Sequence, residues 1–165
     1  MLLTAEAAEK MEKTGVAKRV TPLLNRPDAV SPAKFTVEIF PHDGVHKWTE
    51  DFYGPVWIPK KGATLTLTPE NYSIYERAIR VFEGNQLERQ GDKFIINGQE
   101  TNQYTFKMDY FWMMGDNRHQ SQDSRFWGFV PEDHVVGEAW IIWMSLNKGI
   151  RWNLLFKPIH EIGGT

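Results

Sequence analysis

The chain has no cysteine among its 165 residues. This absence excludes a disulfide framework, a thiolate zinc site and a cysteine nucleophile, but it leaves the cellular compartment open. An excess of charge of one sign is also missing, because 19 Lys and Arg stand against 21 Asp and Glu and give a net charge of −2. Without a basic surplus to attract phosphate groups, we expect no nucleic acid partner.

A long hydrophobic run is the third absence. The longest purely apolar stretch, Ala139–Met144, has about six residues, whereas a membrane-spanning helix needs roughly 20. The opening residues, MLLTAEAAEKMEK, contain no basic segment followed by an apolar core, so we expect no signal peptide there. Thr4 is instead a candidate N-cap for an amphipathic helix that ends near Lys13. We expect the chain by itself to be soluble.

Aromatic residues are abundant, at 13% of the chain, and they favour strands. The length suits one domain of ordinary size. Most of the nine prolines lie within Thr21–Pro59, which predicts an irregular segment broken by one short strand, KFTVEIF. A turn at Lys60–Gly62 then precedes an alternating run, Ala63–Leu67, that predicts a strand.

The second half of the chain predicts one more helix and then strands. Apolar residues at helical spacing indicate a helix from about Pro69 to Asn85. Beyond it we expect β hairpins: KFIING with a type I′ turn at Asn97-Gly98, then QETNQYTFK and MDYFWMM. A helical turn at Pro131–His134 and strands at Val135–Met144 and IRWNLLF complete the prediction. The fold is therefore expected to be mainly β (α+β), with two helices in the first half.

A dense polar cluster, GDNRHQSQDSRFWGFVP, follows the predicted strand MDYFWMM. One interpretation is a self-satisfied loop, in which Asp116 and Asp123 accept backbone N–H groups and pair with Arg118 and Arg125. Two arginines capable of bidentate pairing exceed what a turn requires, however, because such pairing chiefly provides fixed geometry. We therefore expect the loop to hold something else in position.

Metal binding fits neither of two candidate places. A calcium loop that started at Asp116 would put Arg118 and Gln120 at ligand positions and would lack the final Glu. His42 and His46 are four residues apart, but Gly44 and nearby prolines argue against a helix that would align them. We expect no metal and no cofactor.

Serine chemistry is a better fit to the cluster. No G-x-S-x-G string occurs, and His119 is too close in sequence to form a convincing triad with Ser121 or Ser124. A serine can also be activated by a neutral lysine, since burial lowers the pKa of the ammonium group. Such an arrangement needs a second hydroxyl to orient the lysine.

The cluster resembles the last signature block of the type I signal peptidases (leader peptidases), GDNRxxSxDSRxWGxVP. The text VVGEA resembles the strand that follows in that family, and IPKKG and YTFKMDYFWMM resemble members with an enlarged insertion in the catalytic domain. The resemblance covers roughly Tyr53 to Trp152. It implies a signal-peptidase-like β fold, incomplete at its N-terminal side, in an enzyme that removes signal peptides with a Ser nucleophile and a Lys base.

The same resemblance implies a role for each polar residue of the block. Ser121 is implied to orient the catalytic lysine and not to attack the substrate. Asp123 and Arg125 are implied to form an ion pair that holds the loop. Asp116 is implied to pair with an arginine beside the catalytic lysine, while Arg118 braces the same wall. These residues are predicted to be the supporting shell of an active site.

The two other signature blocks of that family are missing from the chain. No Ser-Met-x-Pro string occurs, and Ser31-Pro32 lacks both the Met and the spacing. Lys18-Arg19-Val20 begins like the block of the base but does not continue into Gly-x-Pro-Gly-Asp, and Lys60 and Lys61 lie at a turn, where lysine stays charged. We therefore expect the nucleophile and the base to lie outside this chain, which would be inactive alone. A catalytically dead homologue is the open alternative.

We expect residues 1–52 to be a helix plus an irregular, insertion-like segment, and residues 53–165 to be the C-terminal part of the catalytic domain. The parent enzyme is implied to be membrane-anchored, with this domain on the outer (periplasmic) face. Its implied partners are the signal peptide region of preproteins and the membrane lipid surface, which the tryptophans beyond residue 110 could contact. The sequence leaves the oligomeric state open.

Two other functions stay open at this point. One is a noncatalytic β domain that binds extended peptide by adding a strand to an open sheet edge. The other is a self-cleaving repressor domain, which shares Ser/Lys chemistry, although no DNA-binding segment is evident.

Overall fold

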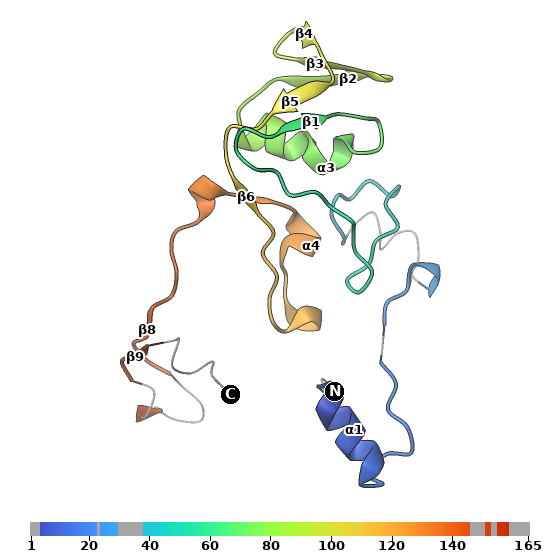
Figure 1. Cartoon of the computed structure of the whole chain (residues 1–165), viewed down its shortest axis with the longest axis vertical. Helices are drawn as coiled ribbons and strands as arrows, with labels where there is room; N and C mark the ends of the chain where they lie inside the picture. Colours follow the sequence, from blue (N-terminus) through green and yellow to red (C-terminus); the bar gives the residue numbers. More distant parts are fainter. Residues whose placement is uncertain (1–3, 23, 30–37, 146–150, 153–154, 159–165) are drawn as a thin grey trace. The chain divides into compact units, whose positions relative to one another are not determined.

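The computed structural model describes residues 4–22, 24–29, 38–145, 151–152 and 155–158. The chain divides into two compact units, Met1–Pro131 and Glu132–Thr165, and each is treated by itself below. Its strands form four small antiparallel sheets accompanied by a few short helices (Figure 1). The predicted mainly β (α+β) fold class is thereby confirmed.

The predicted N-terminal helix is present as α1 (Ala5–Lys13). The Thr4 hydroxyl accepts a hydrogen bond from the Ala7 N–H at 3.1 Å, which satisfies one of the free donors of the first turn. None of its residues is buried. A single 3₁₀ turn, η1 (Pro27–Ala29), follows.

The proline-rich segment has no strand between residues 38 and 59, as predicted for most of it. The expected strand KFTVEIF falls mainly on residues outside the described part of the chain. Two of its residues, Ile39 and Phe40, are described and buried. Phe40 belongs to the hydrophobic core and contacts the ring of Phe129 at 5.9 Å between centroids. This segment therefore contributes to the core although it lacks regular structure.

The next strand and helix agree with the predictions. Strand β1 (Thr64–Thr66) pairs with β5 (Gln103–Thr105). Helix α3 (Tyr72–Arg77) continues into a wider π-helical turn, η2 (Ala78–Phe82), which the apolar spacing alone could not distinguish from α-helix. Figure 1 shows α3 beside β1 and β5.

A three-stranded sheet follows, formed by β2 (Leu87–Gln90), β3 (Lys93–Ile96) and β4 (Gln99–Glu100). The β3–β4 connection confirms the predicted turn, because Asn97 and Gly98 both have positive φ, 52° and 82°. Strand β2 was not predicted. Only its first residue is buried, so the alternation that marks a strand is absent.

The core of the first unit is aromatic. Tyr75 stacks on Phe129 at 5.7 Å between centroids, and Phe106 meets Tyr110 edge to face at 5.6 Å. The buried residues of this core come from the proline-rich segment, from α3 and η2, and from the strands or the residues beside them. They are Phe40, Leu67, Ile74, Tyr75, Ala78, Ile79, Leu87, Phe94, Ile96, Tyr104, Phe106, Tyr110 and Phe129. This core supports the strands from which the polar loop emerges.

The polar loop connects β6 (Tyr110–Phe111) to β7 (Val130–Pro131), which pair with each other. It contains a 3₁₀ turn, η3 (Arg118–Gln120), and the short helix α4 (Ser124–Trp127). The predicted strand MDYFWMM is therefore correct in place but only two residues long.

The second unit begins with η4 (Glu132–His134), the predicted helical turn. The predicted strand Val135–Met144 is wrong in extent: only β8 (Ile141–Ile142) is a strand, and it pairs with β9 (Lys157–Pro158). A β-prone run forms a strand only where another strand pairs with it. The predicted turn at Asn147–Gly149 lies outside the described residues. Of the predicted strand IRWNLLF, residues 151–152 and 155–156 are described, and they form no strand. Among the described residues, no helix is long and apolar enough to cross a membrane.

Candidate active-site loop

The loop between β6 and β7 is hydrogen-bonded to the residues that directly follow β6. Ser124 and Met113 exchange two hydrogen bonds: the Ser124 N–H donates to the Met113 carbonyl at 3.0 Å, and its hydroxyl accepts the Met113 N–H at 2.9 Å. Asp123 accepts the Gly115 N–H at 3.1 Å and caps α4 by accepting the Arg125 N–H at 3.2 Å. Both ends of the segment between Gly115 and Asp123 are thus held close together.

Asp123 and Arg125 form a bidentate ion pair, as the resemblance implied. The guanidinium Nε donates to Asp123 Oδ1 and Nη2 donates to Oδ2, both at 2.8 Å. Burial alone would raise the pKa of Asp123, but the hydrogen bonds from Arg125 and from the Gly115 N–H outweigh it and lower the pKa to about 2. The same pair raises the pKa of Arg125. Both side chains therefore stay charged in spite of their burial.

Arg125 also connects α4 to η3 and to the proline-rich segment. Its Nη1 donates to the Glu50 carbonyl at 3.0 Å, and its Nη2 donates to the Arg118 carbonyl. Its own carbonyl accepts the Phe40 N–H at 2.9 Å. With 1% of its surface exposed, Arg125 is the link between α4, η3 and the proline-rich segment.

Asp116 and Arg118 behave differently. Both are exposed, and neither side chain has a hydrogen-bond or ion-pair partner among the residues that the structure describes. The interpretation of the loop as fully self-satisfied is therefore wrong for this half, because the expected internal pairing of Asp116 and Arg118 is not formed. Their side chains are free to meet groups that approach from outside the described part.

Ser121 lies against the backbone of Gly115. A Cβ atom placed on Gly115 would lie 2.1 Å from Ser121 Oγ and 2.6 Å from Ser121 Cβ, far inside van der Waals contact. Only a residue without a side chain fits there. The Ser121 side chain is partly buried by this contact. Its place in space is thus set by Gly115 on one side and by the Asp123–Arg125 pair on the other.

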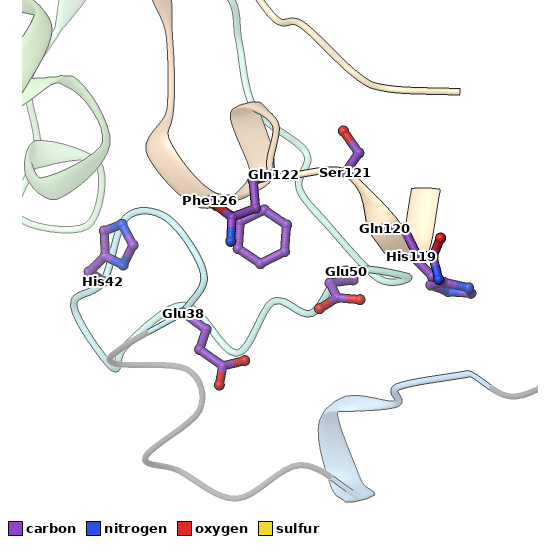
Figure 2. A pocket seen from close by; sticks show the side chains of 8 residues that line it. All are labelled: Glu38, His42, Glu50, His119, Gln120, Ser121, Gln122 and Phe126. Carbon is purple, nitrogen blue, oxygen red and sulfur yellow. The ribbon is translucent and has the colours of Figure 1, made fainter. Parts of the chain in front are cut away.

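Ser121 also lines an open pocket of about 650 Å³ (Figure 2). The lining side chains come from the polar loop and the proline-rich segment: Glu38, His42, Glu50, His119, Gln120, Ser121, Gln122 and Phe126. Figure 2 shows the Ser121 hydroxyl directed away from Glu50 and His119, in keeping with its contact with Gly115. No lysine is among the lining residues.

His119, which lines the pocket, contacts an aspartate outside the pocket lining, and the sequence did not predict this contact. His119 Nε2 lies 2.7 Å from Asp51 Oδ1. Burial opposes ionisation of Asp51, but hydrogen bonds from the Asn25 N–H and from His119 outweigh it, so the pKa of Asp51 is lowered. Asp51 and His119 are 68 residues apart, and no sequence spacing indicates such a contact.

The other sequence candidates lie in ordinary surroundings. His46 Nδ1 contacts Asp43 Oδ2 at 2.7 Å, and Lys60 and Lys61 are exposed. In the described ranges, no group of three or more His, Asp or Glu side chains is arranged to hold a metal ion.

Comparison with known proteins identifies one family. Residues 85–144 match the family described as "Signal peptidase, peptidase S26". The chain is similar to the signal peptidase I of Haemophilus influenzae, with 51% identity over 73 residues, 40% of this chain and 21% of that protein. No solved structure matches.

Two further relatives align over longer stretches. The signal peptidase I of Helicobacter pylori strain J99 is 31% identical over 134 residues, 69% of this chain and 46% of that protein. The signal peptidase I of Leptolyngbya laminosa is 30% identical over 112 residues, 54% and 55% of the two chains. The matches therefore span between about a fifth and about half of the length of these relatives.

Proposed function

We propose, from the match of residues 85–144 to the signal peptidase family, that this chain is the C-terminal part of a type I signal peptidase that removes signal peptides from secreted preproteins. The proposed chemistry is that of a serine endopeptidase with a lysine general base. In this proposal the chain supplies the loop that orients the lysine. The signal peptide region of the preprotein is the proposed partner.

The observation that carries the proposal is the placement of Ser121. Ser121 lines a pocket with its hydroxyl directed away from Glu50 and His119, and it lies between a glycine that leaves room for it and an ion pair that fixes the following residues. It has no hydrogen-bond partner within the described part of the chain. A hydroxyl held in this way can accept a hydrogen bond from an N–H of an incoming amine and so direct the lone pair of the amine towards the nucleophile.

The nucleophile and the base are proposed to come from a segment outside this chain. The side chains of Asp116 and Arg118 are exposed and have no partner among the described residues. This supports the view, because each could pair with a charged group that such a segment brings. Lysine is an effective base only when it is neutral, and a desolvated site lowers its pKa. The incoming segment would supply that desolvation by covering the pocket.

Contact with lipid is proposed for the second unit. Trp140, Trp143 and Trp152 are 77%, 68% and 71% exposed, and tryptophan side chains are stable at a membrane–water interface. Their exposure fits a membrane-anchored enzyme whose catalytic domain works on the outer face of the membrane. We expect the tryptophan fluorescence of the chain to shift to the blue on addition of anionic phospholipid vesicles, and less so in the triple variant with Trp140, Trp143 and Trp152 replaced by Ser.

The test of the function restores the missing part. The chain alone and the chain joined to an upstream signal peptidase segment with the Ser-Met-x-Pro and lysine blocks are each incubated with a preprotein. We expect cleavage only by the joined protein, after a small residue in an Ala-x-Ala context. If the joined protein is folded and does not cleave, the proposal is wrong. Peptide binding without cleavage would instead support a noncatalytic β domain.

A further inference from the structure

A tight turn of the proline-rich segment lies beside the polar loop. In this turn the Thr49 N–H donates to the Phe52 carbonyl at 2.9 Å, and the Phe52 N–H donates to the Thr49 hydroxyl at 3.1 Å. Thr49 is also buried, and its hydroxyl donates to the Asn25 carbonyl. The turn is therefore well supported and presents the Glu50 carbonyl and the Asp51 carboxylate to the loop.

Both carboxylate oxygens of Asp51 are used. Oδ2 accepts the Asn25 N–H at 2.7 Å, and Oδ1 contacts His119 Nε2 at 2.7 Å. The first contact fixes the direction of the second, because a carboxylate held at one oxygen can rotate little. Nε2 is the donor in the protonated ring and in one neutral tautomer, so the contact does not depend on the charge of His119.

The segment that precedes Ser121 has few other attachments. Three hydrogen bonds join residues 116–120 to one another. The Arg118 N–H donates to the Asp116 carbonyl, and the Gln120 N–H donates to the Asn117 carbonyl. The Asn117 side-chain amide donates to the Gln120 side-chain carbonyl. Arg125 reaches this segment through the Arg118 carbonyl. In the described part of the chain, His119 is the one side chain of this segment that bonds outside it.

The signature pattern and the family match assign no role to either residue. Asp51 lies outside the matched residues 85–144, and His119 falls on a position that the GDNRxxSxDSR pattern leaves open. The pair is nevertheless close to the proposed site, since His119 is two residues before Ser121 and lines the same pocket.

We propose that Asp51 and His119 are a positioning pair that fixes the approach to Ser121, so that the turn around Thr49 sets the geometry of the site. The inference rests on the proposed function. Arg125 and Asp123 hold the residues after Ser121 and reach those before it through the Arg118 carbonyl and the Gly115 N–H. The His119–Asp51 contact adds a side-chain attachment two residues before Ser121. A hydroxyl directs an amine accurately only if both flanks of its backbone are fixed.

The test compares four variants of the joined protein: His119→Ala, Asp51→Ala, His119→Gln and His134→Ala. We expect the first two to lower kcat roughly tenfold and to leave KM unchanged, since they loosen the catalytic geometry without removing substrate contacts. His119→Gln keeps a side-chain N–H donor and should stay within about twofold of the wild type. His134→Ala is the matched control, because His134 also contacts an aspartate, Asp133, at 2.7 Å but does not line the pocket.

A second measurement does not depend on activity. In the ¹H–¹⁵N spectrum of the chain itself, His119→Ala and Asp51→Ala should each shift the Ser121 amide signal, and the double variant should shift it no further. If the joined wild-type protein does not cleave a preprotein, the proposed function fails, while the amide shifts still test the pair. An unmoved Ser121 signal in both single variants, or a kcat that falls as far in His119→Gln as in His119→Ala, would overturn the inference.

Discussion

The polar loop contains the pattern Asp-x-Arg twice, and the two copies differ in burial and in side-chain pairing. Asp123 and Arg125 are buried and paired in bidentate fashion, and Arg125 is also bonded to Glu50 and Arg118. Asp116 and Arg118 carry the same charges at the same spacing, yet they are exposed and have no side-chain partner among the described residues. Identical chemistry therefore serves two purposes in one loop.

The difference lies in what surrounds each pair. Asp123 is the N-cap of α4, so its carboxylate is held by the helix N-terminus as well as by Arg125. The carbonyls of Glu50 and Arg118 accept further N–H groups of the guanidinium. Asp116 and Arg118 have no such neighbours in the described ranges. The first pair thus supports the loop, and the second remains available for groups outside it.

Loss of Arg125 should have the largest effect. Arg125→Met leaves Asp123 buried without its counter-ion, and we expect the free energy of unfolding to fall by about 3–5 kcal/mol. Arg118→Met is the matched control and should change it by less than about 0.5 kcal/mol. Urea unfolding of both variants gives the two changes in the free energy of unfolding. Equal losses would mean that Arg118 stabilises the fold as much as Arg125 does.

Acidification should destabilise the chain through the buried pair. The pKa of Asp123 is about 2 in the folded chain against an ordinary value of 3.8, so its stabilising effect is complete above pH 4 and is lost as the pH falls through 2. The expected loss is roughly 2–3 kcal/mol. The free energy of unfolding, measured between pH 5 and 2, should depend less steeply on pH in Asp123→Asn than in the wild type. Some dependence should remain in both proteins, because the pKa of Asp43 is also lowered to about 2. Equal slopes in the two proteins would contradict this account.

Gly115→Ala should disturb Ser121 directly. The added methyl group would overlap Ser121 Oγ and Cβ, and we expect unfolding free energy to fall by about 1–3 kcal/mol. The double variant Gly115→Ala with Ser121→Gly removes the overlapping atoms and should recover most of the loss. A double-mutant cycle measures this coupling, and additive effects would show that the two residues are not in contact.

Asp116→Asn should have the smallest effect on stability, less than about 0.5 kcal/mol, because the exposed carboxylate has no described partner to lose. Its effect should appear instead in the joined protein, as a lower kcat without a change in the unfolding midpoint. Thermal unfolding and preprotein cleavage measured on the same samples check both statements. A marked loss of stability would mean that Asp116 is part of the loop's own support.

Local features of the fold could be predicted from the sequence. The α1 helix followed from Thr4 and the spacing of apolar residues, and the β3–β4 turn followed from Asn97-Gly98, because each depends on neighbours in the chain. The Asp123–Arg125 pair was predicted from the family pattern. Strand β2 was missed, since a strand with a single buried residue has no alternation to detect.

Contacts between distant segments could not be predicted. Asp51 and His119 are 68 residues apart, and the Arg125 bond to Glu50 spans 75 residues. The proline-rich segment was predicted to be irregular apart from the strand KFTVEIF. This is correct for residues 41–59, whereas residues 38–40, the described end of that predicted strand, form no strand. The sequence did not reveal that Phe40 is buried or that residues 49–52 form a supported turn. The roles assigned to Asp116, Arg118 and Ser121 in catalysis, and the division at residue 52, stay predictions.

The most direct test of the account is the turnover of the joined protein with Ser121→Ala. If Ser121 orients the lysine, kcat for preprotein cleavage should fall roughly 100-fold or more while the unfolding midpoint stays at the wild-type value. A folded Ser121→Ala protein that cleaves at the wild-type rate would contradict the central claim.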